Sequence, residues 1–280
     1  MFKKGASNDE IRPSPIAGTW YPGTPDGLAA VIDGFLANVP PQDVPGRPLG
    51  LVAPHAGYVY SGQVAAYAYR LVQGQQYRRV VVLSPCHAPY PGRFLVTSRH
   101  YATPLGVVPV DHAAVDLLAE RLPITRLQYD EEHSLEIQLP FLQRVLGEFE
   151  LVPVMLRNQT WQDCQDLAEA LDQVLGQERP LLVASTDLCH AHNYDEVRST
   201  DAATLAALER GEAEEFWKTA WQLQGACGLG AVTTVLLLAR RWGAERVQLL
   251  HHTNSGDVTG ERGGYVVGYA AAAVVGPGTA

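Results

Sequence analysis

The hydrophobic positions of the chain fall into short, mostly β-branched runs, and each run is bounded by residues that favour turns. Continuous apolar runs of this length are typical of strands that are buried on both faces of a sheet. They predict strands over residues 49–53, 79–83, 149–156, 180–185, 246–250 and 265–275. The last two runs are joined by a short loop, so we expect that they can pair antiparallel.

The segments between these runs repeat their apolar positions with the period of a helix. They predict helices over residues 25–37, 61–72 (with Ser61 as its N-cap), 112–121, 131–146, 161–175, 199–210, 213–223 and 229–242. Alternating strands and helices are typical of an α/β fold. We therefore predict one domain over residues 1–280, with a central mixed, largely parallel sheet flanked by helices on both faces. Residues 1–14 are expected to form a flexible N-terminal segment.

Composition and charge exclude several classes of protein. Hydrophobic residues make up 46% of the chain and charged residues 18%, which is ordinary for a globular domain. The net charge is −9 and no basic cluster is longer than a pair, so a nucleic-acid partner is not expected. The longest apolar stretch, residues 229–239, is too short to span a membrane. Because the N-terminus lacks the apolar core of a secretory signal, we expect a cytoplasmic protein.

Histidines follow the predicted strands at corresponding positions. His55 comes after the strand at 49–53, His87 after the strand at 79–83, and Asp187 and His190 after the strand at 180–185. The carboxyl ends of parallel strands meet at one edge of an open α/β sheet, where ligands bind. Any one histidine alone is more simply a hydrogen-bonded structural residue, but several at equivalent strand ends predict a metal site. His251 repeats the pattern after the strand at 246–250.

A catalytic metal takes about three protein ligands and keeps an open position, so His55 and His87 require a third partner. Asp187, Cys189, His190 and Cys227 all qualify chemically, and the spacing leaves the choice open. The four cysteines form no Cys-x-x-Cys pair, which excludes a zinc finger and a disulfide scaffold.

Cys227 precedes an apolar helix, where a lowered pKa would favour the thiolate. The alternative is a small buried hydrophobic residue beside glycines. Glu136 and His133 share one face of a predicted helix, and a buried neutral imidazole near the crevice is expected there.

Eight motifs, in order, resemble the Memo family, whose members include protein B of the AmmeMemoRadiSam system. They are Ala17-Gly18-Thr19-Trp20-Tyr21-Pro22, Ala53-Pro54-His55-Ala56-Gly57-Tyr58, Ser84-Pro85-Cys86-His87, Thr103-Pro104-Leu105-Gly106, Glu132-His133-Ser134-Leu135-Glu136, Ser185-Thr186-Asp187-Leu188-Cys189-His190, Cys227-Gly228 and Gly268-Tyr269-Ala270-Ala271. Each motif is weak by itself, whereas the ordered set is specific. Cys86 departs from the family, which often has a small polar residue there.

The resemblance implies a fold similar to class III extradiol dioxygenases, which are non-haem iron enzymes. It implies a metal pocket formed by His55, His87 and Cys227, with Asp187 and His190 in the same pocket. A thiolate then replaces the carboxylate of the usual iron triad, so copper competes with iron, and zinc is a weaker expectation. The resemblance also implies a functional link to a radical SAM protein and an AMMECR-type protein.

Three functions compete on this sequence. The first is a metal-dependent oxidoreductase in which His190, oriented by Asp187, acts as general acid and base. The second is a non-catalytic module that uses the same pocket to hold a metal or a peptide. The third is a zinc hydrolase. The ligand, a small molecule or a peptide, is not identified by the sequence.

Overall fold

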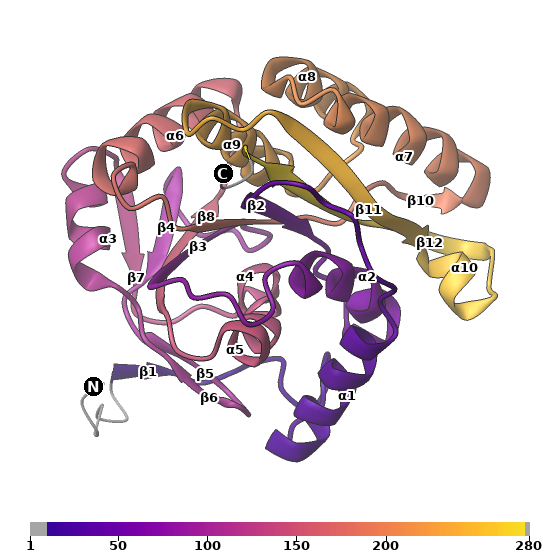
Figure 1. The fold of residues 1–280 in the computed structure, drawn as a ribbon, viewed down its shortest axis with the longest axis horizontal. Helices are drawn as coiled ribbons and strands as arrows, with labels where there is room; N and C mark the ends of the chain where they lie inside the picture. Colours follow the sequence, from indigo (N-terminus) through magenta and orange to yellow (C-terminus); the bar gives the residue numbers. More distant parts are fainter. Residues whose placement is uncertain (1–9, 278–280) are drawn as a thin grey trace.

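A computed structural model describes residues 10–277, and within them the largest element is a nine-stranded mixed sheet (Figure 1). The strand order from one edge is β10 (His190–Asn193), β12 (Gly263–Val275), β2 (Pro48–Ala53), β9 (Leu181–Ser185), β3 (Arg79–Pro85), β8 (Glu150–Leu156), β4 (Phe94–Thr97) and β7 (Ile124–Leu127). The ninth strand, β11 (Arg246–Asn254), pairs antiparallel with β12, as the sequence predicts.

The centre of the sheet is parallel. β2, β9, β3 and β8 run in the same direction, while β12 is antiparallel to β2 and β4 is antiparallel to β8. Every residue of β2 and β9 is buried, which agrees with their unbroken apolar sequences. The carboxyl ends of these four strands therefore lie at one edge of the sheet.

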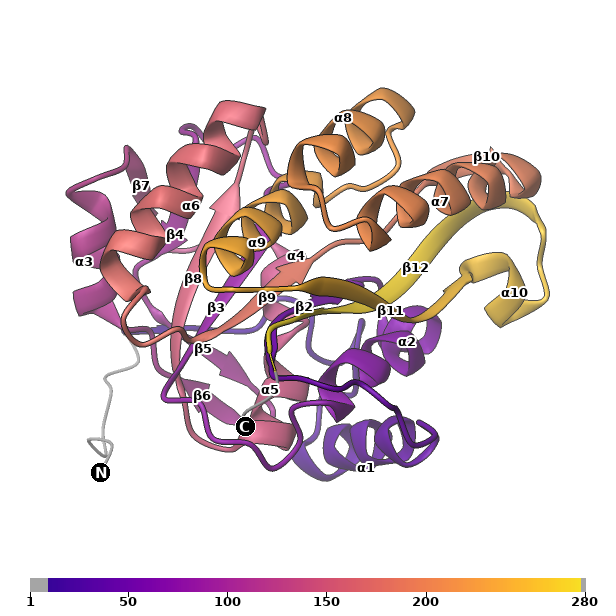
Figure 2. The same ribbon diagram turned by 45° about the horizontal axis from the view of Figure 1, so that its top comes forward.

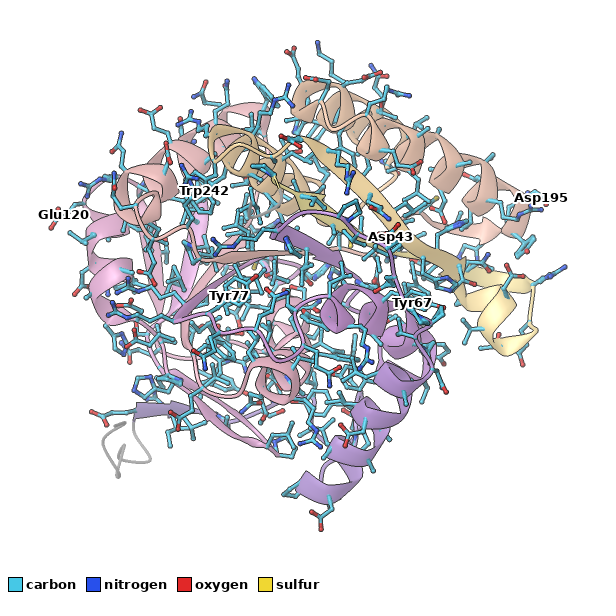
Figure 3. All side chains as sticks on the ribbon, in the orientation of Figure 1. Asp43, Tyr67, Tyr77, Glu120, Asp195 and Trp242 are labelled. Carbon is cyan, nitrogen blue, oxygen red and sulfur yellow. The ribbon has the colours of Figure 1, made fainter. Side chains whose placement is uncertain are left out.

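Helices cover both faces of the sheet, as predicted (Figure 2). One face carries α3 (His112–Ala119), α6 (Trp161–Leu175), α7 (Tyr194–Glu209), α8 (Ala213–Leu223) and α9 (Leu229–Arg241). The other carries α1 (Pro25–Ala37), α2 (Tyr58–Arg70), α4 (His133–Glu136) and α5 (Leu139–Leu146). A small sheet lies near α5, with the order β1 (Ile11–Arg12), β5 (His100–Thr103) and β6 (Gly106–Val108), and the short α10 (Ser255–Thr259) connects β11 to β12. Charged side chains such as Glu120 and Asp195 point outward from the rim (Figure 3).

Three predicted helices differ from the structure, and one of them, expected over residues 199–210, begins five residues earlier as α7 at Tyr194. The helix expected over residues 131–146 is divided into α4 and α5, because Pro140 has no N–H to continue the helical ladder and its ring crowds the carbonyl four residues earlier. The helix expected from Ser61 begins at Tyr58, with Gly57 at its N-cap. Ser61 is not a cap, since its hydroxyl donates to the carbonyl oxygen of Ala56 at 2.9 Å.

The prediction of a flexible segment over residues 1–14 is wrong at its C-terminal end. Residues 1–9 lie outside the described part of the chain. Ile11 and Arg12, however, form β1 and pair with β5, and Arg12 is fully buried. The sequence gives no sign of this, because a two-residue strand is too short to show a period. None of the helices within residues 10–277 combines the length and the apolar composition that a membrane span requires.

Candidate metal centre

Three of the predicted ligands converge at the carboxyl edge of the sheet. His55 follows β2, His87 follows β3, and Cys227 lies two residues before α9. One ligand atom from each residue lies within 4.8 Å of the other two, so the group could hold a single metal ion. The Sγ atom of Cys227 is 3.1 Å from Nε2 of His55. The sequence therefore brings together, from three distant segments, two imidazoles and a thiol.

The tautomer of His55 follows from the hydrogen bonds of Ser185. The Ser185 hydroxyl donates its one proton to the carbonyl oxygen of Ser134 and accepts from the amide Nε2 of Gln138 at 2.7 Å. It can therefore only accept from Nδ1 of His55, which lies 3.0 Å away. His55 then carries its proton on Nδ1, and Nε2, which faces the thiol, has the free lone pair.

His87 is fixed in the same way by a carboxylate. Its Nδ1 lies 2.9 Å from one oxygen of the buried Glu132, and its backbone N–H donates to the other oxygen at 2.6 Å. A carboxylate behind a histidine fixes the tautomer and strengthens the imidazole as a metal ligand. Burial alone would raise the pKa of Glu132, but the hydrogen bond and charge of His87 outweigh burial and hold that pKa well below its usual range. When His87 is neutral, the hydrogen bond to Glu132 keeps its proton on Nδ1 and leaves the lone pair of Nε2 free.

Cys227 is positioned by the loop that follows β9. The backbone N–H of Asp187 donates to Sγ at 3.2 Å, and the backbone N–H of Cys227 donates to the carbonyl oxygen of Asp187 at 3.2 Å. The next residue, Gly228, is in close contact with β9, since a Cβ there would lie 2.2 Å from the carbonyl oxygen of Ser185. Only glycine permits this approach.

The expected lowering of the Cys227 pKa by the start of α9 is wrong. Burial raises the pKa of this thiol well above its usual value, and the charge of Asp187 raises it further. Desolvation therefore outweighs the helix dipole, whose effect at one helix end is modest. The metal-free protein has a neutral thiol at this position.

Asp187 lies in the pocket but does not orient His190, so the prediction of that pair is wrong. The Asp187 carboxylate accepts the backbone N–H of His55 at 2.7 Å, and its other oxygen is 3.9 Å from Nε2 of His55. Burial raises the pKa of Asp187 to about 7. His190 begins β10, which pairs with β12, and this pairing brings its Nδ1 to 3.2 Å from the hydroxyl of Tyr265.

His133 lies at the crevice, as the sequence predicts, but it is only partly buried, with 23% of its side chain exposed. Its ring stacks on the His87 ring with 4.9 Å between centroids, and its centroid lies 4.3 Å from that of the Trp20 ring. Burial is the main cause that lowers the pKa of His133, to about 4, so the ring is neutral near pH 7. With Glu132 and His87 it forms a second group whose ligand atoms lie close enough to hold a cation.

Other candidates lie outside this centre. The thiol of Cys86 donates to the carbonyl oxygen of Ala88 at 3.4 Å, and Cys189 packs in a separate small cluster with Val197 and Val266. His251 stacks on Tyr67 of α2, at 4.3 Å between centroids. Glu136 is buried away from the ligands and belongs to the cluster around Arg12 described next.

A buried ionic cluster, which the sequence does not reveal, holds the Glu132 segment in place. The guanidinium of Arg12 donates to both oxygens of Asp130, at 2.9 and 2.8 Å, and to Glu136. It also donates to the backbone carbonyl of Glu132 at 3.0 Å. The strand β1 thus supports, through Arg12, the carboxylate that fixes His87.

The ligand group opens into a cleft of about 670 Å³. Aromatic and imidazole side chains form much of its wall, and among the described residues that line it there is no Lys or Arg. Val59 and Tyr265, at 77% and 57% exposure, leave an apolar rim accessible from solvent. The lining includes Trp20, His55, Val59, Tyr60, His87, His133, Asp187, His190, Tyr265 and Tyr269.

Glutamine at position 132 is expected to weaken metal binding by roughly 10- to 100-fold, the usual cost of losing a carboxylate behind a ligating histidine. The change keeps the shape of the side chain but removes the charge that holds the His87 Nδ1–H. The measurement is a competition titration of Co²⁺ against a chelator. The control is Glu131→Gln, at the exposed neighbouring position, and equal affinities in the two variants would contradict the role of Glu132.

The fold and site define an α/β protein with a candidate metal centre of two histidines and one cysteine at the edge of a mixed sheet. The chain matches the family model described as Memo-like protein over residues 12–273. It is 32% identical to a MEMO1 family protein of Nitrosopumilus maritimus, over 93% of this chain and 98% of that protein. It is 35% identical to one of Thermotoga maritima, over 93% and 98%, and 32% identical to one of Methanocaldococcus jannaschii, over 95% and 99%. The chain belongs to the Memo family.

Proposed function

We propose that this Memo family protein is a metal-dependent oxidoreductase that holds one iron or copper ion through His55, His87 and Cys227. The observation that best supports the proposal is the fit of the donor set. Both imidazoles are fixed as Nδ1–H tautomers, and the Nε2 of His55 faces the thiol. Three protein ligands also leave room for a further ligand from the cleft.

The donor set supports a soft or borderline metal. Two imidazoles and a thiolate suit copper, and two imidazoles with an anionic third ligand suit iron(II). Zinc accepts the same ligands, so a zinc hydrolase is the weaker alternative. Elemental analysis of protein purified without added metal distinguishes these ions.

When bound, such an ion supplies one-electron chemistry and an open coordination position. The residues of this chain then bind and orient a substrate. Trp20 and Tyr265 line the cleft with aromatic side chains, and the carboxylate of Glu261 on the same wall disfavours an anionic substrate. His190 lies on the cleft wall with Nδ1 near Tyr265, which leaves its Nε2 to exchange a proton with the substrate.

A second candidate function, a non-catalytic module that binds a metal or a peptide, is favoured by the apolar rim. Val59, Tyr60 and Tyr265 are exposed at the mouth of the cleft, as in a surface that docks an extended chain. Oxygen consumption decides between the two. The protein is loaded anaerobically with iron(II) or copper(I) and given oxygen with ascorbate as electron donor. Oxygen uptake that continues beyond oxidation of the bound ion and exceeds that of the same amount of free metal supports the oxidoreductase, whereas uptake that stops at stoichiometric oxidation with metal retained supports the binding module.

Alanine at His190 is expected to leave the metal content unchanged and to lower any oxygen-dependent turnover by about 100-fold or more, the usual effect of losing a general acid or base. The matched control is His192→Ala, because His192 is also on β10 and also contacts the Tyr265 ring. Loss of metal from the His190 variant, with the fold intact, would instead identify His190 as a ligand.

The cellular setting is also a proposal. The family resemblance supports a cytoplasmic protein that is linked in function to a radical SAM protein and an AMMECR-type protein. Co-purification of the three proteins after joint expression tests the link, and recovery of this chain alone would contradict a stable complex.

A further inference from the structure

Gln159, in the loop between β8 and α6, binds the segment that carries Cys227. Its side-chain Nε2 donates to the carbonyl oxygen of Cys227 at 2.9 Å. Its Oε1 accepts the backbone N–H of Gly230 at 2.8 Å. The first N–H groups of a helix have no partner within the helix, and one of those of α9 is satisfied in this way. A single amide therefore joins the ligand residue to the first turn of α9.

The backbone of Gln159 is held in an unfavourable conformation. Its φ is 56°, in the left-handed region that residues other than glycine rarely adopt. The indole N–H of Trp217, on α8, donates to the Gln159 carbonyl oxygen at 3.0 Å. Residues held in this region cost free energy and persist where surrounding contacts fix them, often at functional sites. Here the conformation directs the side chain toward Cys227.

The segment from Cys227 to Gly230 leaves space for the Gln159 side chain at Gly230. A Cβ at position 230 would lie 2.8 Å from Cβ and 2.9 Å from Cγ of Gln159. Glycine is unfavourable inside a helix, so its presence in the first turn of α9 fits the need for close approach. The rest of α9 packs against α6, α8 and the strands β2, β3 and β9, which hold the helix without this contact.

We infer that Gln159 is a positioning residue of the metal centre. It fixes the backbone from Cys227 to Gly230, so that the thiol stays directed at His55 and His87. Gln159 follows β8, whose carboxyl end lies at the same sheet edge as those of β2, β3 and β9. The fourth parallel strand thus contributes to the centre through a neutral amide. This inference rests on the proposed function, because it assigns Gln159 to the same ion.

Glycine at position 159 separates positioning from folding. Gln159→Gly removes the amide but accepts the left-handed backbone more readily than glutamine does. Relief of the left-handed backbone offsets part of the cost of the two lost hydrogen bonds, so we expect the melting temperature to fall by only a few degrees. Co²⁺ affinity should fall by roughly 10- to 100-fold, as for other residues that orient a metal ligand. The thiolate-to-cobalt absorption band should weaken at saturating Co²⁺, and a purely structural residue would not change that band.

Two further variants complete the experiment. Arg179→Gly is the matched control, since Arg179 also has a left-handed backbone, with φ 51°, and its guanidinium contacts Trp242 and not the centre. It should keep both the band and the affinity. In Gly230→Ala, the added methyl group displaces the Gln159 side chain, although alanine has a higher helix propensity than glycine. This variant should therefore weaken the thiolate-to-cobalt band as Gln159→Gly does.

The possible results are distinct. A wild-type protein that binds no Co²⁺ through a thiolate would overturn the proposed site and the role of Gln159 with it. A wild-type band that stays unchanged in Gln159→Gly and Gly230→Ala would overturn the role of Gln159 alone. An equal loss in Arg179→Gly would also overturn it, because the effect would then follow from relaxing any strained loop.

Discussion

Alanine at His55 or at His87 is expected to lower metal affinity by far more than 100-fold, so that the purified variant no longer holds a stoichiometric ion. Each change removes one of three donors, which costs more than the roughly 10- to 100-fold loss typical of a residue behind a ligand. His55 is 2% exposed and has a defined tautomer, so a water molecule in its place would not reproduce the oriented lone pair. The measurement is the number of metal ions per chain after loading and gel filtration.

His251→Ala is the matched control for these variants. His251 also lies on a strand of the large sheet, but its ring stacks on Tyr67 away from the ligand group. The control should retain the wild-type metal content. A His55→Ala, His87→Ala double variant with full metal content under the same loading would show that the ion binds elsewhere.

Replacement of Arg12 by methionine is expected to destabilise the metal-free protein by about 3–5 kcal/mol, the typical cost of removing one partner from a buried ion pair. Arg12 and its partners Asp130 and Glu136 are all fully buried. Methionine fills similar space but leaves two carboxylates in the interior without a cation. The measurement is the free energy of unfolding in urea.

Arg144→Met is the control for this experiment. Arg144 pairs with Asp33 through two bonds of 2.6 Å, yet both side chains are about half exposed. Exposed pairs contribute about 0–1 kcal/mol, so this variant should unfold almost as the wild type does. If both variants lost the same free energy of unfolding, burial of the Arg12 cluster would not explain its contribution to the stability of the protein.

The sequence is sufficient to predict six of the nine strands of the large sheet and the convergence of His55 and His87, whereas β4, β7 and β10, with four residues each, are not predicted. His55 and His87 follow unbroken apolar strands, and the convergence of parallel strand ends is a general property of α/β sheets. Cys227 is different, because Cys189 fits the same spacing argument. What separates the two cysteines is the close approach of Gly228 to Ser185, a contact between distant segments that periodicity does not report. Only the family resemblance singled out Cys227 as the candidate third ligand.

The residues that were missed act through contacts across long sequence separations. Arg12 meets Asp130 and Glu136 across 118 and 124 positions, and a lone arginine near the N-terminus carries no periodic signal. The predicted contact between Asp187 and His190 is wrong because it was inferred from their closeness in the sequence, which does not ensure that the two side chains face each other. The strand β10 begins at His190 and turns the ring toward Tyr265, 75 positions away.

The position of β12 in the sheet has a consequence for when the proposed metal centre can form. β2, which leads to His55, lies between β9 and β12, and β12 ends at Val275. His55 and Cys227 are separated by 172 positions. On the ribosome, the two histidines emerge long before the cysteine and the strand that completes the sheet around them, and contacts this distant form late in folding. Under the proposed function, a nascent chain therefore carries at most two of the three donors until Cys227 emerges, and the complete centre forms only when these distant segments have folded together.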